Sequence, residues 1–235
     1  MTTTSPNTAA LPAEPRSEDA AALPLVIADP VAADSPALIA PVTHPVVTRT
    51  IKRAIDIGGA AVALVLLSPV LLVAAIGTKL TSKGPVLFRQ ERIGRGGVAF
   101  TMYKLRTFPV EHRDVQFSTE HRDCPLPFGR MLRRTSIDEL PQLVNVLKGD
   151  MSLVGPRPER VAFAEPFCTS VPGYRERHRV RGGLTGLAQV SGMVGNTSIP
   201  TRTGLDNEYI DTWSLRLDLR ILLRTLPAVL HKIHD

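Results

Sequence analysis

The stretch from Arg130 to Pro158 reads RMLRRTSIDELPQLVNVLKGDMSLVGPRP and brings together four arginines, two adjacent carboxylates, a short apolar segment and a proline-rich loop. The leucines and valines between residues 140 and 147 recur at helical spacing, which predicts a helix that buries one face. Gly149 stands where a helix commonly ends in a left-handed residue. Pro141 is tolerated only near the first turn, so the helix is expected to start just before it.

The adjacent carboxylates Asp138 and Glu139 fall at the expected start of this helix, near Ser136 to Asp138. Ser136 and Glu139 match the S-x-x-E capping box, and acidic residues in a first turn are common because they favour the positive end of the helix dipole. On position alone, the pair is therefore explained by helix capping.

The arginines around the pair favour a second interpretation. Arg130, Arg133 and Arg134 precede it, and Arg157 follows in a loop stiffened by prolines on both sides. These arginines exceed what two carboxylates require, and they suit an anion with several oxygens, such as a diphosphate. An aspartate held ionised by such neighbours can attack phosphorus.

An apolar segment from Ala54 to Thr78 predicts contact with a membrane, since its length is sufficient for a spanning helix. Ser68-Pro69 interrupts the middle of the segment, where proline removes a backbone donor. Basic residues flank both ends: Lys52, Arg53, Lys79 and Lys83. Because basic flanks tend to stay in the cytoplasm, we expect a re-entrant helix–break–helix, with Ser68 able to satisfy a freed carbonyl. A kinked single span and a buried core helix are the alternatives.

Two strand-like runs, Val86–Arg92 and Val98–Arg106, flank the glycine-rich turn Gly94–Gly97 and predict a β-hairpin. Lys104 and Arg106 should lie on the same face at the end of the second strand, because strand side chains alternate.

Further along, Leu205–Leu226 is amphipathic and contains the only tryptophan, which suits a membrane interface or packing against the domain.

Charge separates the chain into two parts. Residues 1–47 hold one arginine and five acids, are rich in Ala, Pro, Thr and Ser, and are expected to form a disordered tail. The remainder carries 27 basic and 17 acidic residues, which favours phosphorylated substrates or an anionic membrane face. Aromatic residues make up only 5%, so nucleic acid is not expected as a partner.

The runs SIDELPQL and GDMSLVGPRP resemble the signature of the bacterial sugar transferases, the small monotopic phosphoglycosyl transferases. The resemblance extends from about Lys52 to about Leu226. It implies an α/β (α+β) fold with a small β-hairpin and surrounding amphipathic helices. Residues 48–83 would form the re-entrant membrane helix, with Ser68 and Pro69 at its break, and residues 84–235 would form a cytosolic catalytic domain.

The resemblance also implies a reaction: transfer of a sugar-1-phosphate from a UDP-sugar to a polyprenol (undecaprenyl) phosphate at the cytoplasmic face of the bacterial inner membrane. Exopolysaccharide or glycoconjugate synthesis would begin with this step. Asp138 would form a covalent phospho-sugar intermediate with release of UMP, and Glu139 would hold Mg²⁺ or orient Asp138. The substrate would be bound by Lys104, Arg106, Arg133, Pro156, Arg157 and Pro158, with the four basic side chains on its phosphates. Membrane lipids are expected partners, and a homodimer is possible.

Two departures from the family pattern concern phosphate handling. Gly182 stands where proline is usual, and Met193 falls about where the family tends to carry an arginine. Either Arg202 or another base takes over, or phosphate is handled differently. Two other functions stay open: a glycosyltransferase that uses Asp138 as a base and releases UDP, and a catalytically silent scaffold for glycan assembly.

Overall fold

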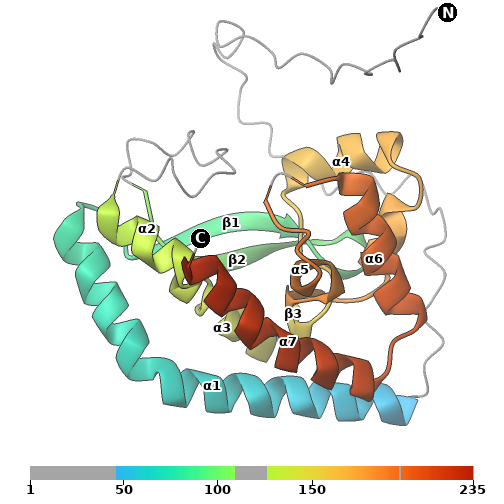
Figure 1. Cartoon of the computed structure of the whole chain (residues 1–235), viewed down its shortest axis with the longest axis horizontal. Helices are drawn as coiled ribbons and strands as arrows, with labels where there is room; N and C mark the ends of the chain where they lie inside the picture. Colours follow the sequence, from blue (N-terminus) through green and yellow to red (C-terminus); the bar gives the residue numbers. More distant parts are fainter. Residues whose placement is uncertain (1–45, 109–125, 196, 235) are drawn as a thin grey trace, which may run out of the picture. The chain divides into compact units, whose positions relative to one another are not determined.

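A computed structural model of the protein describes residues 46–108, 126–195 and 197–234, so the predicted tail lies almost wholly outside the described residues. The fold is a mixture of helices and two small sheets, which confirms the predicted class (Figure 1). The elements are α1 (Val46–Thr81), β1 (Leu87–Ile93), η2 (Arg95–Gly97), β2 (Ala99–Leu105), α2 (Pro127–Arg134), η6 (Ile137–Glu139), α3 (Gln142–Lys148), β3 (Met151–Val154), α4 (Val161–Ser170), η7 (Tyr174–Arg179), β4 (Gly182–Thr185), α5 (Leu187–Val190), α6 (Ile199–Asp211) and α7 (Leu215–His234).

Helix α1 is a single apolar helix of 36 residues with Pro69 inside it. Pro69 has no N–H to give to the carbonyl of Val65, and the hydroxyl of Ser68 donates to that carbonyl instead, at 2.7 Å. The expected role of Ser68 is thereby confirmed. Figure 1 shows that α1 bends part-way along its length, as a proline within a helix requires. The helix is long and apolar enough to cross a membrane.

The predicted hairpin is confirmed: β1 and β2 pair antiparallel, from Leu87 opposite Leu105 to Ile93 opposite Ala99. Gly96 and Gly97 adopt positive φ values of 70° and 81° in the turn, which a glycine allows at little cost. A second, parallel sheet joins β3 to β4 and was not predicted. Each of its strands has only four residues.

The start of the helix after the carboxylate pair differs from the prediction. Ser136 has a left-handed backbone (φ 56°), and its side chain does not cap the helix. Asp138 and Glu139 belong to a short 3₁₀ turn, and α3 begins only at Gln142. The predicted capping box is therefore wrong, whereas Gly149 ends α3 with a φ of 97°, as predicted. The carboxylate pair is consequently positioned by a tight turn that precedes the helix.

The N-terminal half of α1 belongs to the core that supports this turn. Ala60 of α1 packs with buried side chains of β2, α3 and β3: Met102, Leu143, Val146 and Met151. Arg53 donates to the carbonyls of the last turn of α3, at 2.6 and 2.9 Å. The buried Asp56 accepts hydrogen bonds from Lys52, Ser152 and the main chain of Leu153. The long apolar helix α1 and the segment that carries the carboxylate pair are thus packed as one unit.

The predicted amphipathic stretch Leu205–Leu226 consists of two helices, α6 and α7, separated by a turn around Trp213. Asp218 holds the turn, because its carboxylate accepts from the hydroxyl of Tyr209 at 2.8 Å and from the indole N–H of Trp213 at 3.2 Å. Pro227 was expected to end or bend the stretch, and it lies within α7.

Candidate active site

Glu139 lies at the centre of a partly buried ion cluster formed by η6, β2 and the loop after β3. Its carboxylate accepts a hydrogen bond from Nζ of Lys104 at 2.9 Å and from both terminal nitrogens of Arg157. Burial raises the pKa of Glu139, but the charges of Arg157 and Lys104 together lower it well below its usual range. The carboxylate therefore stays ionised and fixes the direction of the Arg157 guanidinium.

Asp138 is also buried, with 7% of its surface exposed. Its negative charge acts to raise the pKa of both Lys104 and Arg157, so it lies within electrostatic reach of the two cations that hold Glu139. The attraction of Glu139 raises the pKa of Arg157, while burial lowers that of Lys104. Glu139 is thus paired directly with Lys104 and Arg157, and Asp138 lies in the positive field of the same two cations.

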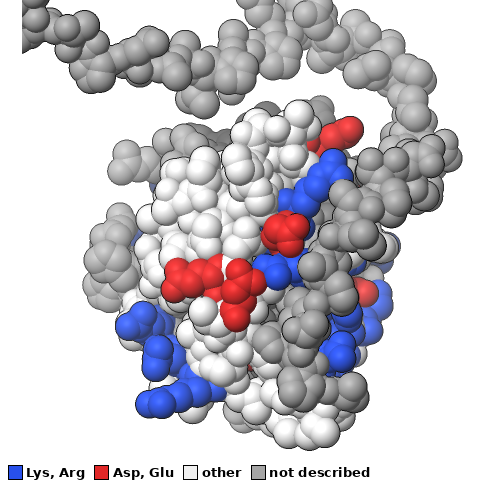
Figure 2. Space-filling model, turned by 90° about the vertical axis from the view of Figure 1, so that its right-hand side faces the viewer, with Lys and Arg blue, Asp and Glu red and all other residues white. Residues whose placement is uncertain are grey.

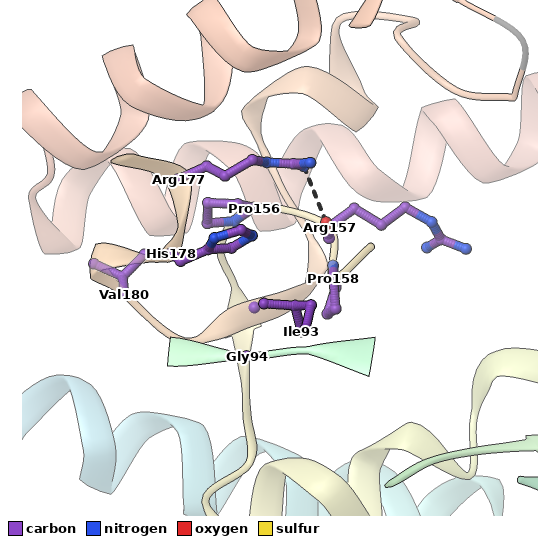
Figure 3. A pocket seen from close by; sticks show the side chains of 9 residues that line it. Ile93, Gly94, Pro156, Arg157, Pro158, Arg177, His178 and Val180 are labelled. Carbon is purple, nitrogen blue, oxygen red and sulfur yellow. Dashed lines mark hydrogen bonds between the residues drawn. The ribbon is translucent and has the colours of Figure 1, made fainter. Parts of the chain in front are cut away.

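The Pro156–Arg157–Pro158 loop is held by its carbonyl groups. Prolines lack an N–H, so the loop offers mainly acceptors for fixing its path. Each of its three consecutive carbonyls accepts a hydrogen bond from another element; the donors are, in order, the main chain of Gly183 (2.8 Å), the side chain of Arg177 (3.0 Å) and the side chain of Arg92 (3.1 Å). Figure 3 shows Arg177 reaching the carbonyl of Arg157 while the Arg157 guanidinium points away.

Arg177 is itself fixed on the other side. It forms a buried ion pair with Asp206 of α6 at 2.6 Å and donates a hydrogen bond to the hydroxyl oxygen of Tyr174 at 3.0 Å. Burial raises the pKa of Asp206, and the charge of Arg177 opposes that rise. Arg92 has its pKa lowered to about 10 by burial and by the charge of Arg157, and it therefore remains protonated at neutral pH. The buried side chains of Arg92 and Arg177 therefore fix the backbone of the loop that carries Arg157.

Most of the predicted site residues come together here. Asp138, Glu139, Lys104 and Arg157 form the cluster, and the two loop prolines flank Arg157. Arg106 is placed differently: its guanidinium donates to the carbonyls of Ser82, Lys83 and Pro85. It ties the end of α1 to the hairpin, and the structure does not bring it to Glu139.

Arg133 lies over the ring of Phe108, with its guanidinium carbon 5.1 Å from the ring centre. One of its terminal nitrogens is buried and, within the described residues, has no hydrogen-bond partner. Its charge also acts to lower the pKa of Arg160 after the proline loop. A buried donor without a partner is costly, and it suits a ligand oxygen.

The two departures from the family pattern have structural counterparts. A Cβ atom on Gly182 would lie 2.4 Å from the Cγ atom of Pro158, so the glycine lets β4 approach the loop. Arg202 is buried on α6, with its guanidinium 3.8 Å from the Glu159 carboxylate. Burial lowers the pKa of Arg202, and the charge of Arg157 lowers it further. The guanidinium of Arg202 donates to the carbonyl of Gly195 and to the hydroxyl of Thr197, and a phosphate role for Arg202 stays a prediction.

Sequence reasoning missed Arg92, and it did not distinguish Arg177 from the basic residues around it. A signal for Arg92 was present in the pairing of the hairpin. Arg92 lies opposite Phe100, and Lys104 lies opposite Phe88, so both cations lie on the same face of the hairpin. Arg177 stood among five basic residues between positions 175 and 181, and only the tertiary pairing with Asp206 distinguishes it.

Among the described residues, no group of three or more His, Cys, Asp and Glu side chains could hold a metal ion. Asp138 and Glu139 are the carboxylates at hand, and both oxygens of Glu139 already accept from cations. The residues therefore do not build a complete metal site. They fit a magnesium ion that takes most of its ligands from a bound diphosphate and water, as this ion commonly does.

The fold and site together define a membrane-associated protein with a buried cationic cluster around two carboxylates, an arrangement suited to phosphoryl groups. The sequence model described as bacterial sugar transferase matches residues 47–232, and the chain belongs to this family.

Similar curated proteins include the UDP-glucose:undecaprenyl-phosphate glucose-1-phosphate transferase of Caulobacter vibrioides, 48% identical over 76% of this chain and 69% of that protein. The Escherichia coli protein of the same name is 44% identical over 77% of this chain, which spans only 40% of the relative. The exopolysaccharide production protein PSS of Rhizobium leguminosarum is 40% identical over 77% of this chain and 95% of its own length.

Proposed function

We propose that the protein transfers a sugar-1-phosphate from a UDP-sugar to undecaprenyl phosphate or a similar polyprenol phosphate, as the names of its relatives state for those proteins. The step would begin the synthesis of an exopolysaccharide or glycoconjugate. One observation carries the proposal: the partly buried Glu139 is held by Arg157 and Lys104, and the buried Asp138 lies in the field of the same cations.

The reaction is proposed to proceed in two displacements. A carboxylate oxygen of Asp138 attacks the sugar-bearing phosphorus of the donor, and the bond to the bridging oxygen breaks, so that UMP leaves with that oxygen. A phosphate oxygen of the polyprenol phosphate then attacks the same phosphorus. The bond to Asp138 breaks, the carboxylate is regenerated, and a polyprenol diphosphate sugar is formed.

The cations have distinct roles in this proposal. Arg157 and Lys104 neutralise charge on the transferring phosphoryl group, and Glu139 keeps Arg157 in one direction. Arg133, with its unpartnered buried nitrogen, is proposed to donate to a substrate oxygen. A phosphate contact by Arg106 stays a prediction, since this side chain is bonded to three main-chain carbonyls.

Magnesium is proposed as the cofactor, with Glu139 as the residue that would hold it. When bound, the ion would neutralise the diphosphate of the donor. Chelation is expected to stop UMP release, and turnover that is indifferent to chelator would contradict a metal requirement.

The membrane arrangement is proposed to be re-entrant, with α1 entering one leaflet, bending at Pro69 and returning to the cytoplasmic face of the inner membrane. Basic residues at both ends and the bend support this arrangement. A site held at the headgroup plane meets a lipid-bound acceptor already oriented. A homodimer stays a prediction.

The identity of the released nucleotide tests the reaction. Purified enzyme in nanodiscs with polyprenol phosphate and a panel of UDP-sugars should release UMP with at least one donor. Release of UDP would favour a conventional glycosyltransferase, and absence of any nucleotide with every donor would favour a silent scaffold.

A further inference from the structure

Helix α7 carries an exposed apolar row that the described part of the chain leaves uncovered. The row consists of Leu219, Leu222, Leu223, Leu226 and Leu230, and Leu223 and Leu226 are 69% and 66% exposed. Their spacing of three and four residues places them on one side of the helix. Asp218 and Ile221 are buried and lie on another side, toward the core. Five exposed leucines on one helix face form a surface that needs an apolar environment.

A second row runs along the edge of this leucine row. Arg216, Arg220 and Arg224 are spaced by four residues and are all exposed. Within the residues that the structure describes, none of the three forms an ion pair. The only acid in α7 is Asp218, which is buried and paired with Lys52 at 2.9 Å. The exposed surface of the helix is therefore apolar on one side and purely cationic beside it.

The buried pair between Lys52 and Asp218 also fixes where this surface lies. It ties the start of α7 to the start of α1, the long apolar helix, and Figure 1 shows the two helices starting on the same side of the domain. In Figure 2 this side is at the bottom, and lysine and arginine side chains gather at the lower left, below the acidic ones. The α7 surface is therefore continuous with the end of the molecule that meets the bilayer through α1.

We propose that α7 is a docking surface for anionic phospholipids, with the leucine row in the interface and the three arginines bound to phosphodiester headgroups. An amphipathic helix with this distribution lies in the membrane plane, and arginines at its edge reach the headgroups while their stems cover apolar surface. Anionic lipids are favoured over zwitterionic ones because no exposed acid on α7 offsets the arginines. The inference concerns lipid composition and does not depend on the proposed reaction.

The only tryptophan of the chain gives a local probe, since Trp213 lies directly before α7. The full-length protein is reconstituted in nanodiscs with equal amounts of phosphatidylcholine and phosphatidylglycerol, and bromine is carried by only one of the two lipids. Bromine on phosphatidylglycerol is expected to quench Trp213 fluorescence about twofold more than bromine on phosphatidylcholine. Because α1 inserts in either lipid, the difference reports on the surroundings of α7.

The variant Arg216→Gln/Arg220→Gln/Arg224→Gln should equalise the two quenching values. The control Arg89→Gln/Arg95→Gln removes exposed charges from the β-hairpin and should preserve the difference. Equal quenching by the two lipids in the unmodified protein would overturn the proposal, as would no quenching by either. A difference that survives in the triple variant would overturn the role of the arginine row.

Discussion

Arg157 and Glu139 form a two-pronged ion pair in which Nη1 of the arginine lies 3.0 Å from Oε2 of the carboxylate and Nη2 contacts Oε1. Lys104 completes the pair at 2.9 Å. The pairing leaves the three groups with one net positive charge, next to the carboxylate of Asp138. A phosphoryl group that enters this site meets a cationic surface whose geometry is already fixed.

Glu139→Gln should weaken both the fold and the reaction, because it leaves Arg157 and Lys104 as neighbouring cations without their shared counter-charge. Because about a third of the Arg157 side chain is exposed, solvent screens part of this repulsion, and the loss is roughly 1–2 kcal/mol of unfolding free energy. Denaturant unfolding in detergent measures this loss, and UMP release measures the rate. The double variant Glu139→Gln/Lys104→Met removes the excess charge and should recover part of the stability. Unchanged stability of Glu139→Gln would contradict the role of the pair.

Arg177→Lys should lower kcat, because lysine cannot hold both Asp206 and the carbonyl of Arg157. A displacement of the Arg157 backbone by about 1 Å is expected to cost on the order of 100-fold in rate. Arg179→Lys is the matched control, since Arg179 belongs to the same short helix but pairs with the exposed Asp211. A loss in kcat that appears equally in both variants would show that Arg177 has no special part in positioning.

Pro69→Ala should change the topology of α1, because alanine restores the helical N–H and removes the cause of the bend. Single cysteines at positions 49 and 83, in a background without Cys124 and Cys168, should both react with an impermeant reagent on the cytoplasmic side. In Pro69→Ala, one of the two should become protected. Pro85→Ala, outside the helix, is the control. Reaction from opposite sides before the substitution would contradict the re-entrant arrangement.

His178 should make stability depend on pH in the acidic range. Burial, together with the charges of Arg177 and Arg175, lowers its pKa from 6.5 to about 4. Between these values the unfolded chain binds the proton and the folded protein does not, so stability is full above pH 6.5 and falls as pH decreases toward 4. The total loss is about 3 kcal/mol as an upper value. His178→Asn should flatten this part of the unfolding-against-pH curve, and an unchanged slope would contradict it.

The sequence was sufficient for the parts of the fold and site that depend on local patterns. Alternation and glycines predicted the hairpin, and the position of Gly149 predicted the end of α3. The motif predicted that Asp138, Glu139 and Arg157 act together, and the structure brings these residues to one cluster.

The remaining features depend on contacts between distant residues. Strand alternation predicted the face of the hairpin on which Arg106 lies. Only the folded chain shows that its guanidinium donates to the carbonyls of Lys83 and Pro85, which follow α1. The capping box failed because Ser136 adopts a positive φ, a backbone state that the S-x-x-E pattern does not report. The parallel pairing of β3 with β4 was missed because four-residue strands carry too short a pattern.

The central claim is that Asp138 carries the phospho-sugar during transfer. Enzyme quenched after mixing with a productive UDP-sugar alone, under conditions that give turnover, is digested and measured by mass spectrometry. The account predicts a sugar-phosphate adduct on the peptide that contains Asp138, which disappears when polyprenol phosphate is added and never forms in a folded Asp138→Asn variant. Release of UMP on turnover without any such adduct, or an active Asp138→Asn enzyme, would contradict it.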